Sequence, residues 1–259
     1  MKPITPPAIQ FKNVTHTFFS KKEEVTAIQN INFTVEQGET LVLVGPSGCG
    51  KSTILSLLAG IYKQTAGQIF LFGKEEETQA AKCTGYMLQK DGLLEWRTVL
   101  KNMILGLEFR KQDTPERIDY ALQLLKQTGL EHTAHQYPSQ LSGGMRQRVA
   151  LVRTLAVNPK ILLLDEPFSA LDIQNKITLE DLLMDVIQKQ NKTAVLVTHD
   201  LEEALAVGDR ILVMGDRPGT IQKTIIVPEE IRVLSSLKSR SHPVFRELFE
   251  QLWQEVEHR

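Results

Sequence analysis

Two glycine-rich turns in this sequence have the composition of phosphate-binding sites. The first, Gly45-Pro46-Ser47-Gly48-Cys49-Gly50-Lys51-Ser52, matches the pattern G-x-x-x-x-G-K-[ST]. In this pattern the glycines let several backbone N–H groups point at phosphate, the lysine reaches the β- and γ-phosphates, and the hydroxyl ligates Mg²⁺. With Thr53 directly after it, this turn predicts a site for a nucleoside triphosphate and its magnesium ion.

The second turn lies far along the chain, in Leu141-Ser142-Gly143-Gly144-Met145-Arg146-Gln147-Arg148. Ser142 can cap a helix that runs on through Val149, Val152 and Leu155, and the two glycines let backbone N–H groups approach an anion closely. A P-loop by itself indicates only a nucleotide phosphate. The second turn raises the question of whose phosphate it binds.

Polar side chains follow two apolar runs of the strand type. Asp165 and Glu166 end the run at residues 161–164, and His199 follows Thr193–Val197. In open α/β sheets the functional edge lies at the carboxyl ends of the strands. We therefore expect Asp165 to serve Mg²⁺, Glu166 to polarise the water that attacks the γ-phosphate, and His199 to sense that phosphate.

The remaining polar residues carry less information about chemistry. Gln89 lies at the junction of two regions, where its amide can contact Mg²⁺ or the attacking water. Cys49 occupies a variable position of the phosphate loop and receives no catalytic role. Cys83, His132 and His135 have no metal-ligand spacing, and we interpret them as structural or surface residues.

Strands and helices must position these residues. Thr40–Val44 has the pattern of a buried strand that leads into Gly45, and Lys51–Leu58 that of a helix ending at Gly60. Strand, glycine-rich loop and helix is the order that a P-loop needs. Further strands are expected at residues 9–11, 27–35, 68–72 and at Arg210–Met214.

A mainly helical stretch interrupts this pattern from about residue 91 to residue 158. Within it, Thr114 can cap a helix that begins at Pro115 and ends near Gly129. We predict a helical subdomain inserted into an α/β core. A terminal amphipathic helix begins near Pro243; we expect it to pack on the core, and docking on a partner is the alternative.

The composition excludes several classes of protein. The 259 residues include 42% hydrophobic and 24% charged residues, with a net charge of −1, so no basic field indicates nucleic acid. Two cysteines fit a reducing compartment. The N-terminus lacks the apolar core of a signal peptide, and no run of about 18 apolar residues is present. We therefore expect a cytoplasmic chain that reaches a membrane only through a partner.

Taken together, these segments resemble the nucleotide-binding subunit of ATP-binding cassette (ABC) transporters, from Phe11 to about Ile226. The resemblance identifies residues 45–52 as the Walker A motif, residues 161–166 as Walker B, residues 141–148 as the ABC signature, residues 169–172 as the D-loop, Gln89 as the Q-loop glutamine and His199 as the switch histidine. Phe18 falls where the family has an aromatic residue that stacks on adenine. Met145 for glutamine and Phe18 for tyrosine are departures that leave phosphate contact and the stacking face intact.

The fold implied by the resemblance is α/β: a P-loop NTPase core of the ABC-ATPase type with an antiparallel β-subdomain and the inserted helical subdomain. It assigns an ABC ATPase domain to residues 1–227 and a C-terminal helical extension to residues 228–259.

The resemblance also implies ATP and Mg²⁺ as ligands and a head-to-tail homodimer. Each ATP then lies between residues 45–53 of one subunit and Ser142, Gly143 and Gly144 of the other, because an isologous arrangement makes one chain supply both halves. Lys51, Gln89, Glu166 and His199 are the expected catalytic residues, and Ser52, Gln89 and Asp165 the expected Mg²⁺ ligands. An integral-membrane permease, indirectly a solute-binding protein, and the cytoplasmic face of the membrane complete the expectation, with no nucleic acid.

Residues 92–99, 166–172 and 216–219 are similar to the nitrate/sulfonate/taurine importer subfamily, which also serves bicarbonate and thiamine-precursor uptake. The alternatives are a soluble ABC-type ATPase of DNA repair or translation, a small-molecule kinase and a non-transporting regulatory subunit. The first usually has two cassettes, coiled-coil insertions or zinc modules, and the second lacks a signature and a switch histidine. Intact Lys51, Asp165, Glu166 and His199 argue against the third.

Overall fold

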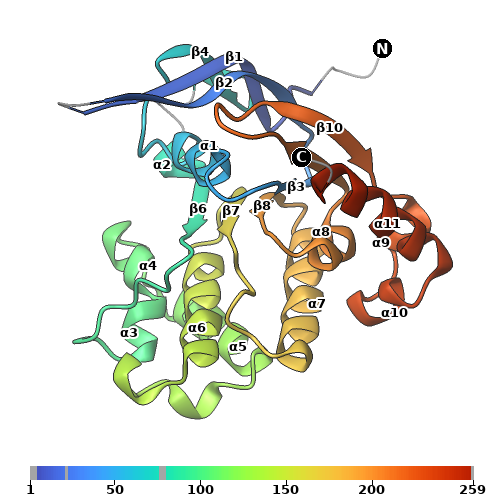
Figure 1. The fold of residues 1–259 in the computed structure, drawn as a ribbon. Helices are drawn as coiled ribbons and strands as arrows, with labels where there is room; N and C mark the ends of the chain where they lie inside the picture. Colours follow the sequence, from blue (N-terminus) through green and yellow to red (C-terminus); the bar gives the residue numbers. More distant parts are fainter. Residues whose placement is uncertain (1–4, 21–22, 76–79, 258–259) are drawn as a thin grey trace.

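The computed structural model describes residues 5–20, 23–75 and 80–257. They form an antiparallel sheet, a mainly parallel sheet and a helical layer, with the antiparallel sheet at the top of Figure 1 and the helical layer below. The predicted α/β class, with an antiparallel β-subdomain and helices inserted into a P-loop core, is confirmed.

The antiparallel sheet has the strand order β2-β1-β4-β5. Its members are β1 (Ile9–Phe19), β2 (Glu24–Val35), β4 (Ala66–Leu71) and β5 (Lys74–Glu75). β1 is much longer than the predicted residues 9–11, since its backbone keeps pairing with β2 through register shifts near Asn13. Asn13 lies in the left-handed region at φ 49°, so the bulge breaks the apolar alternation that marks a strand in a sequence.

The second sheet has the strand order β10-β9-β3-β8-β7-β6. It comprises β3 (Thr40–Val44), β6 (Thr84–Met87), β7 (Ile161–Asp165), β8 (Thr193–Val197), β9 (Arg210–Met214) and the antiparallel edge strand β10 (Ile221–Ile226). The carboxyl ends of β3, β6, β7 and β8 therefore meet at one edge, where the predicted chemistry lies.

The core occupies both faces of this sheet. Leu41 and Leu43 of β3 pack with α1 (Lys51–Leu58) and the antiparallel sheet, whereas Val42 and Val44 pack against the other helices. Burial on both faces explains why the central strands read as continuous apolar runs.

The helical layer lies between β6 and β7 in the sequence. It contains α3 (Val99–Met103), α4 (Leu105–Phe109), α5 (Pro115–Gln127), the 3₁₀ turns η2 (Glu131–Thr133) and η3 (Pro138–Gln140), and α6 (Gly143–Ala156), while the short α2 (Ala80–Cys83) precedes β6. Pro115 begins α5 as predicted, but Thr114 makes no side-chain capping bond. Ser142 does cap α6, because its Oγ accepts a hydrogen bond from the Met145 N–H at 3.3 Å.

The chain ends in helices that pack on the core. After α7 (Ile173–Lys189) and α8 (Leu201–Val207) come α9 (Glu229–Arg232), α10 (Ser236–Arg240) and α11 (Pro243–Glu257). Ile231, Phe245 and Leu252 are buried in the cluster that contains the helical layer, so the predicted packing of the terminal helix is confirmed. None of the helices in the described part of the chain is long and apolar enough to cross a membrane.

Candidate functional site

A cavity of about 270 Å³ opens at the carboxyl edge of the parallel sheet. Its lining comprises Phe18, Ala27, Ser47, Gly48, Gly50, Lys51, Ser52, Thr53, Gln89, Glu166, Val197 and Arg217. Most of the predicted site residues therefore meet in one place. Gly45 and Pro46 stand at the start of the same loop, and Cys49 lies buried beneath it.

The phosphate loop is shaped by conformations that only glycine adopts easily. Gly50 has φ 98°, and a Cβ added there would lie 2.4 Å from Cγ2 of Ile28. The buried Lys51 curls back over the loop, where its Nζ donates to the carbonyls of Gly45 and Pro46 at 2.8 Å each. The loop is thus closed by contacts within one chain and holds its cation at the cavity wall.

Asp165 is a buried carboxyl at the end of β7. Burial raises its pKa, and the charge of Glu166 adds to this, while a hydrogen bond with Ser52 and the charge of Lys51 act in the opposite direction. A carboxylate that is costly to ionise and is joined to a hydroxyl would be stabilised by a cation beside it.

The donors at this edge fit Mg²⁺. Ser52, Asp165 and Gln89 offer a hydroxyl, a carboxylate and an amide, and Mg²⁺ binds through one or two carboxylates together with substrate phosphates and water. Among the described residues, no group of three or more His, Cys, Asp or Glu side chains is arranged to hold a metal ion by itself.

Glu166 is the centre of a polar trio. Its Oε2 accepts from Nε2 of Gln89 at 3.0 Å, and its Oε1 lies 3.3 Å from Nδ1 of His199. Its backbone N–H donates to the carbonyl of Val197 at 2.9 Å, which ties the ends of β7 and β8 together. Glu166 has φ 49°, and such a conformation in a residue other than glycine is held by its surroundings, often at functional sites.

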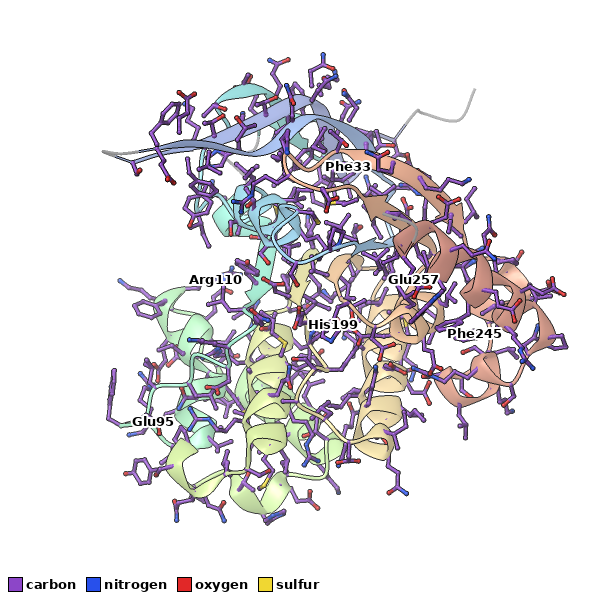
Figure 2. The ribbon with its side chains drawn as sticks, in the orientation of Figure 1. Phe33, Glu95, Arg110, His199, Phe245 and Glu257 are labelled. Carbon is purple, nitrogen blue, oxygen red and sulfur yellow. The ribbon has the colours of Figure 1, made fainter. Side chains whose placement is uncertain are left out.

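His199 lies near the middle of the molecule in Figure 2. It follows β8 by two residues and is 67% exposed. Its ring therefore depends on the backbone of its turn for position, since packing contributes little.

Phe18 forms the outer wall of the cavity. Its ring meets His16 edge-on at 4.6 Å and Tyr62 edge-on at 5.3 Å, while His16 and Tyr62 stack at 5.6 Å. Both ring nitrogens of the buried His16 lack a hydrogen-bond partner among the described residues. Phe18, supported by His16 and Tyr62, therefore presents an aromatic surface for a planar base.

The signature turn lies apart from this cavity. In Figure 1 the P-loop helix α1 lies in the upper part of the molecule, whereas α6 begins toward the bottom. Ser142 and Gly143 are exposed, and a Cβ added to Gly143 would meet nothing within 4 Å. The structure therefore does not bring Ser142, Gly143 and Gly144 to the phosphate loop of their own chain.

The helix α6, which begins at the signature turn, is bonded to the segment that follows β7. The buried Gln147 donates from Nε2 to the Glu166 carbonyl at 2.8 Å and accepts from the Ala170 N–H at 2.9 Å. The turn is thus rigidly placed while its own N–H groups face outward.

Several residues of the site could not be found from the sequence. Arg217 lines the cavity, and its Nε donates to the Gly48 carbonyl at 3.3 Å. Nearby, a Cβ added to Gly219 would lie 1.9 Å from the Cys49 carbonyl oxygen. The dipeptide Pro218-Gly219 signals a turn, but no spacing connects that turn to the P-loop. The aromatic support from His16 and Tyr62 likewise comes from tertiary packing.

Comparisons with known proteins agree with this geometry. A family model described as ABC transporter matches residues 28–169. An uncharacterised ABC transporter ATP-binding protein of Bacillus subtilis is 46% identical, over 94% of this chain and 94% of its own. The taurine import ATP-binding protein of Escherichia coli is 41% identical, over 83% of this chain and 84% of its own. The nitrate import ATP-binding protein of Synechocystis sp. is 39% identical, over 92% and 89%.

Two solved structures of the cassette MJ0796 are also similar. The dimeric structure of this bacterial ABC transporter cassette has a TM-score of 0.79 and 34% identity, covering 85% of this chain and 99% of the cassette. Its dimeric post-hydrolysis state, bound to ADP and Pi, has a TM-score of 0.78 and 33% identity over the same shares.

Proposed function

This chain belongs to the ABC transporter family, and we propose that two copies of it bind and hydrolyse ATP to energise the import of a small solute. The observation that carries the proposal is the meeting of Gln89, Glu166 and His199 beside the cavity lined by Lys51 and Ser52. These residues supply a cation for phosphate, a hydroxyl and amide for Mg²⁺, and a carboxylate for the attacking water.

The protein groups at the cavity have defined tasks in the proposed hydrolysis. The Lys51 ammonium leaves the Gly45 and Pro46 carbonyls for the β- and γ-phosphates, and Phe18 stacks on adenine. Glu166 accepts the proton of the attacking water, while Gln89 and His199 hold the two oxygens of its carboxylate. Bound to Ser52, Asp165 and Gln89, Mg²⁺ would neutralise charge on the β- and γ-phosphates.

The site in a single chain is half of the proposed unit. The phosphate loop faces the cavity, but Ser142, Gly143 and Gly144 have no phosphate partner in their own chain. Two copies related by a two-fold axis would place each signature turn on the partner's ATP, with the helix N-terminus of α6 facing its phosphates. The dimeric state of the MJ0796 cassette supports this arrangement.

A permease docking surface is proposed on the helical layer. Trp96 and Phe109 are 75% and 81% exposed, and Leu88 is 46% exposed next to Gln89. Large exposed apolar side chains mark interaction surfaces, and Glu95 beside Trp96 lies at the outer edge of the molecule in Figure 2. A permease helix seated here would transmit dimer closure to the membrane and hold the chain at its cytoplasmic face.

The proposed cargo is a small anion of the nitrate or taurine type, delivered by a separate solute-binding protein. The names of two relatives support this class, with a thiamine-precursor-like solute as the alternative. We further propose residues 1–227 as the ATPase domain, residues 91–158 as its helical subdomain and residues 228–259 as an extension.

The test is ATP hydrolysis by the purified chain, alone and with its permease reconstituted in vesicles. We expect hydrolysis that Lys51→Ala lowers about a hundredfold, and ATP-dependent uptake of the anion only when permease and binding protein are present. Full hydrolysis in Lys51→Ala would contradict the assigned site. Uptake of none of these solutes would contradict the importer assignment while leaving the ATPase assignment in place.

A further inference from the structure

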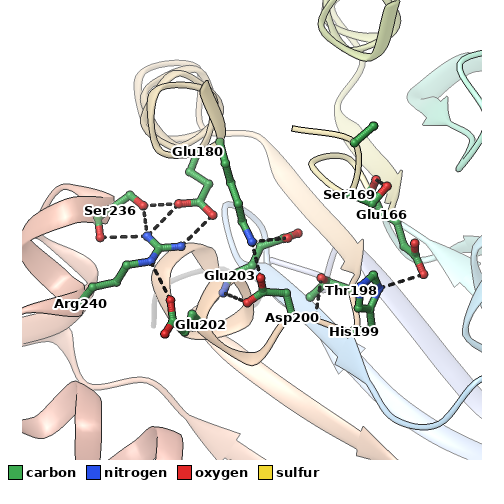
Figure 3. A network of polar contacts seen from close by, with 12 residues as sticks. Glu166, Ser169, Glu180, Thr198, His199, Asp200, Glu202, Glu203, Ser236 and Arg240 are labelled. Carbon is green, nitrogen blue, oxygen red and sulfur yellow. Dashed lines mark hydrogen bonds and ion pairs between the residues drawn. The ribbon is translucent and has the colours of Figure 1, made fainter. Parts of the chain in front are cut away.

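Two sets of ion pairs, one helical turn apart on α7, lie between the C-terminal helices and the turn that carries His199 (Figure 3). The first set begins at Arg240 of α10, whose two NH groups donate to the two carboxylate oxygens of Glu180 at 2.8 and 2.9 Å. Glu180 lies on α7 and is fully buried. Ser236 also bonds to Glu180, and its N–H donates to Asp181 at 2.7 Å, so α10 is fixed to α7 at both ends.

The second set lies one helical turn earlier on α7. The Nζ of Lys176 bonds to the carboxylate of Asp200 and lies 3.3 Å from Oε2 of Glu203. Burial lowers the pKa of Lys176, but the hydrogen bond to Asp200 and the charge of Asp200 outweigh it and raise that pKa. The ammonium is therefore charged and held between the start of α8 and the body of α7.

Asp200 directly follows His199 in the chain and fixes the turn in three ways. Its Oδ1 accepts from the Glu203 N–H at 3.0 Å, its N–H donates to Oγ1 of Thr198 at 3.0 Å, and its Oδ2 bonds to Lys176. Since the His199 ring is mostly exposed, its position relative to Glu166 depends on the backbone of the turn at residues 198–200.

A cluster of buried charges is a poor source of stability, because desolvation offsets most of the attraction. A well-packed apolar contact between α10, α7 and α8 would hold the fold as firmly. The bidentate geometry of Arg240, by contrast, fixes the orientation of α7 relative to α10, and Arg240 also reaches Glu202 of α8 at 3.5 Å. The network therefore sets position more than it adds stability.

We propose that Arg240 is a positioning residue for ATP hydrolysis, acting through Glu180, Lys176 and Asp200 to fix the turn that aims His199 at Glu166. The C-terminal segment is then a working part of the ATPase unit. This inference rests on the proposed role of His199 in hydrolysis.

The test compares Arg240→Met, Arg240→Lys and the double variant Glu180→Met/Arg240→Met in the full chain. The double variant removes the pair without leaving a buried unpaired carboxylate, so it folds even where Arg240→Met alone does not. We expect kcat for ATP to fall about tenfold in the double variant, as for a small misplacement of a reacting group, while ATP affinity stays within about twofold. Arg240→Lys keeps the charge but cannot form the bidentate contact with Glu180, so it should recover only part of kcat.

Arg246→Met is the matched control, because Arg246 of α11 is 85% exposed and pairs only with Glu250 among the described residues. It should leave kcat unchanged. A second readout does not depend on ATP hydrolysis. The NMR signals of the His199 ring can be followed in each variant, and they are assigned because they disappear in His199→Asn. These signals should shift in the Arg240 variants and stay in place in Arg246→Met.

Unmoved His199 signals together with wild-type kcat in the folded double variant would overturn the proposal. Equal losses of kcat, ATP affinity and thermal stability would overturn it too, because they indicate general damage. If the wild-type chain itself does not hydrolyse ATP, the proposed function fails, whereas the NMR shifts still test the positioning network.

Discussion

The two glycine-rich turns of this chain have similar compositions and opposite surroundings. The phosphate loop is closed on its own chain: Lys51 bonds to Gly45 and Pro46, and Gly50 has no room for a side chain. The signature turn is open at Gly143, where an added Cβ meets nothing within 4 Å, whereas a Cβ at Gly144 would lie 3.2 Å from Leu171 of the same chain. Glycine at position 50 thus avoids a clash within its own chain, whereas glycine at position 143 leaves free space at the surface.

The difference between the surroundings of Gly50 and Gly143 bears on the proposed dimer. Glycine at position 50 is required by the fold of the monomer, whereas glycine at position 143 has no reason within the described part of the monomer. The open space beside Gly143 can receive a group that approaches from outside the monomer. A phosphate held by a second copy is the partner that fits a capped helix start.

The largest effect on kcat is expected at Glu166, which lies beside the phosphate loop of the same chain. Glu166→Gln removes the carboxylate that takes the proton but keeps an oxygen for Gln89. We expect kcat for ATP to fall about a thousandfold, with ATP affinity within about threefold. Near-normal turnover in steady-state assays would show that Glu166 is not the general base.

Mixing two defective chains tests whether the open turn serves the partner. Lys51→Ala and Ser142→Arg should each lose about a hundredfold in ATPase activity when alone, because every dimer then has two damaged sites. A mixed dimer has one site built from the two intact halves. An equal mixture should therefore recover about a quarter of wild-type activity.

Activity in that mixture no higher than in the separate variants would mean that both turns act within one chain. Mixing Lys51→Ala with Glu166→Gln is the matched control. Lys51 and Glu166 lie on the same side of the proposed ATP site, beside the phosphate loop. In a mixed dimer each site therefore contains either Lys51→Ala or Glu166→Gln, and we expect no recovery of activity.

Alanine substitutions in the two turns compare their structural needs directly. Gly50→Ala should destabilise the chain by about 1–3 kcal/mol, because φ 98° and the contact with Ile28 both oppose a side chain. Gly143→Ala should change monomer stability by less than about 0.5 kcal/mol and yet weaken ATP-driven dimerisation. Urea unfolding measures the first quantity; equal destabilisation by both changes would remove the contrast between the turns.

The smallest effect on activity is expected at Glu203, because a change to glutamine keeps a polar side chain beside Lys176 and leaves the backbone contact with Asp200 in place. Burial is the main cause that raises its pKa from 4.5 to about 8 in the folded chain. The folded state therefore keeps a proton that the unfolded state releases, so this group lowers stability as pH rises from 4.5 to about 8.

Glu203→Gln should remove that slope, roughly 1.4 kcal/mol for each pH unit within the window, and leave kcat within about twofold. Thermal unfolding of both proteins from pH 5 to pH 8 measures the difference. Parallel stability curves would contradict the raised pKa; a large loss of kcat would show that stability and activity are linked outside the two turns.

The sequence predicted the parts of the site that depend on local pattern. The apolar runs before Gly45 and Asp165 placed two strands correctly, and Ser142 was identified as a helix cap. The sequence could not predict features that depend on long-range packing. The bulge at Asn13 interrupts the apolar alternation of β1, so only its first residues were predicted as a strand. The Arg217 contact with Gly48 and the buried Arg240–Glu180 pair join residues that no periodicity connects.

The central claim is that the signature turn belongs to the partner's ATP site, and the monomer–dimer equilibrium tests it most directly. Sedimentation of Glu166→Gln with ATP should show dimers that disappear without nucleotide. Glu166→Gln/Ser142→Arg should bind ATP with the same affinity and remain monomeric. Equal dimerisation of the two variants with ATP would contradict the account.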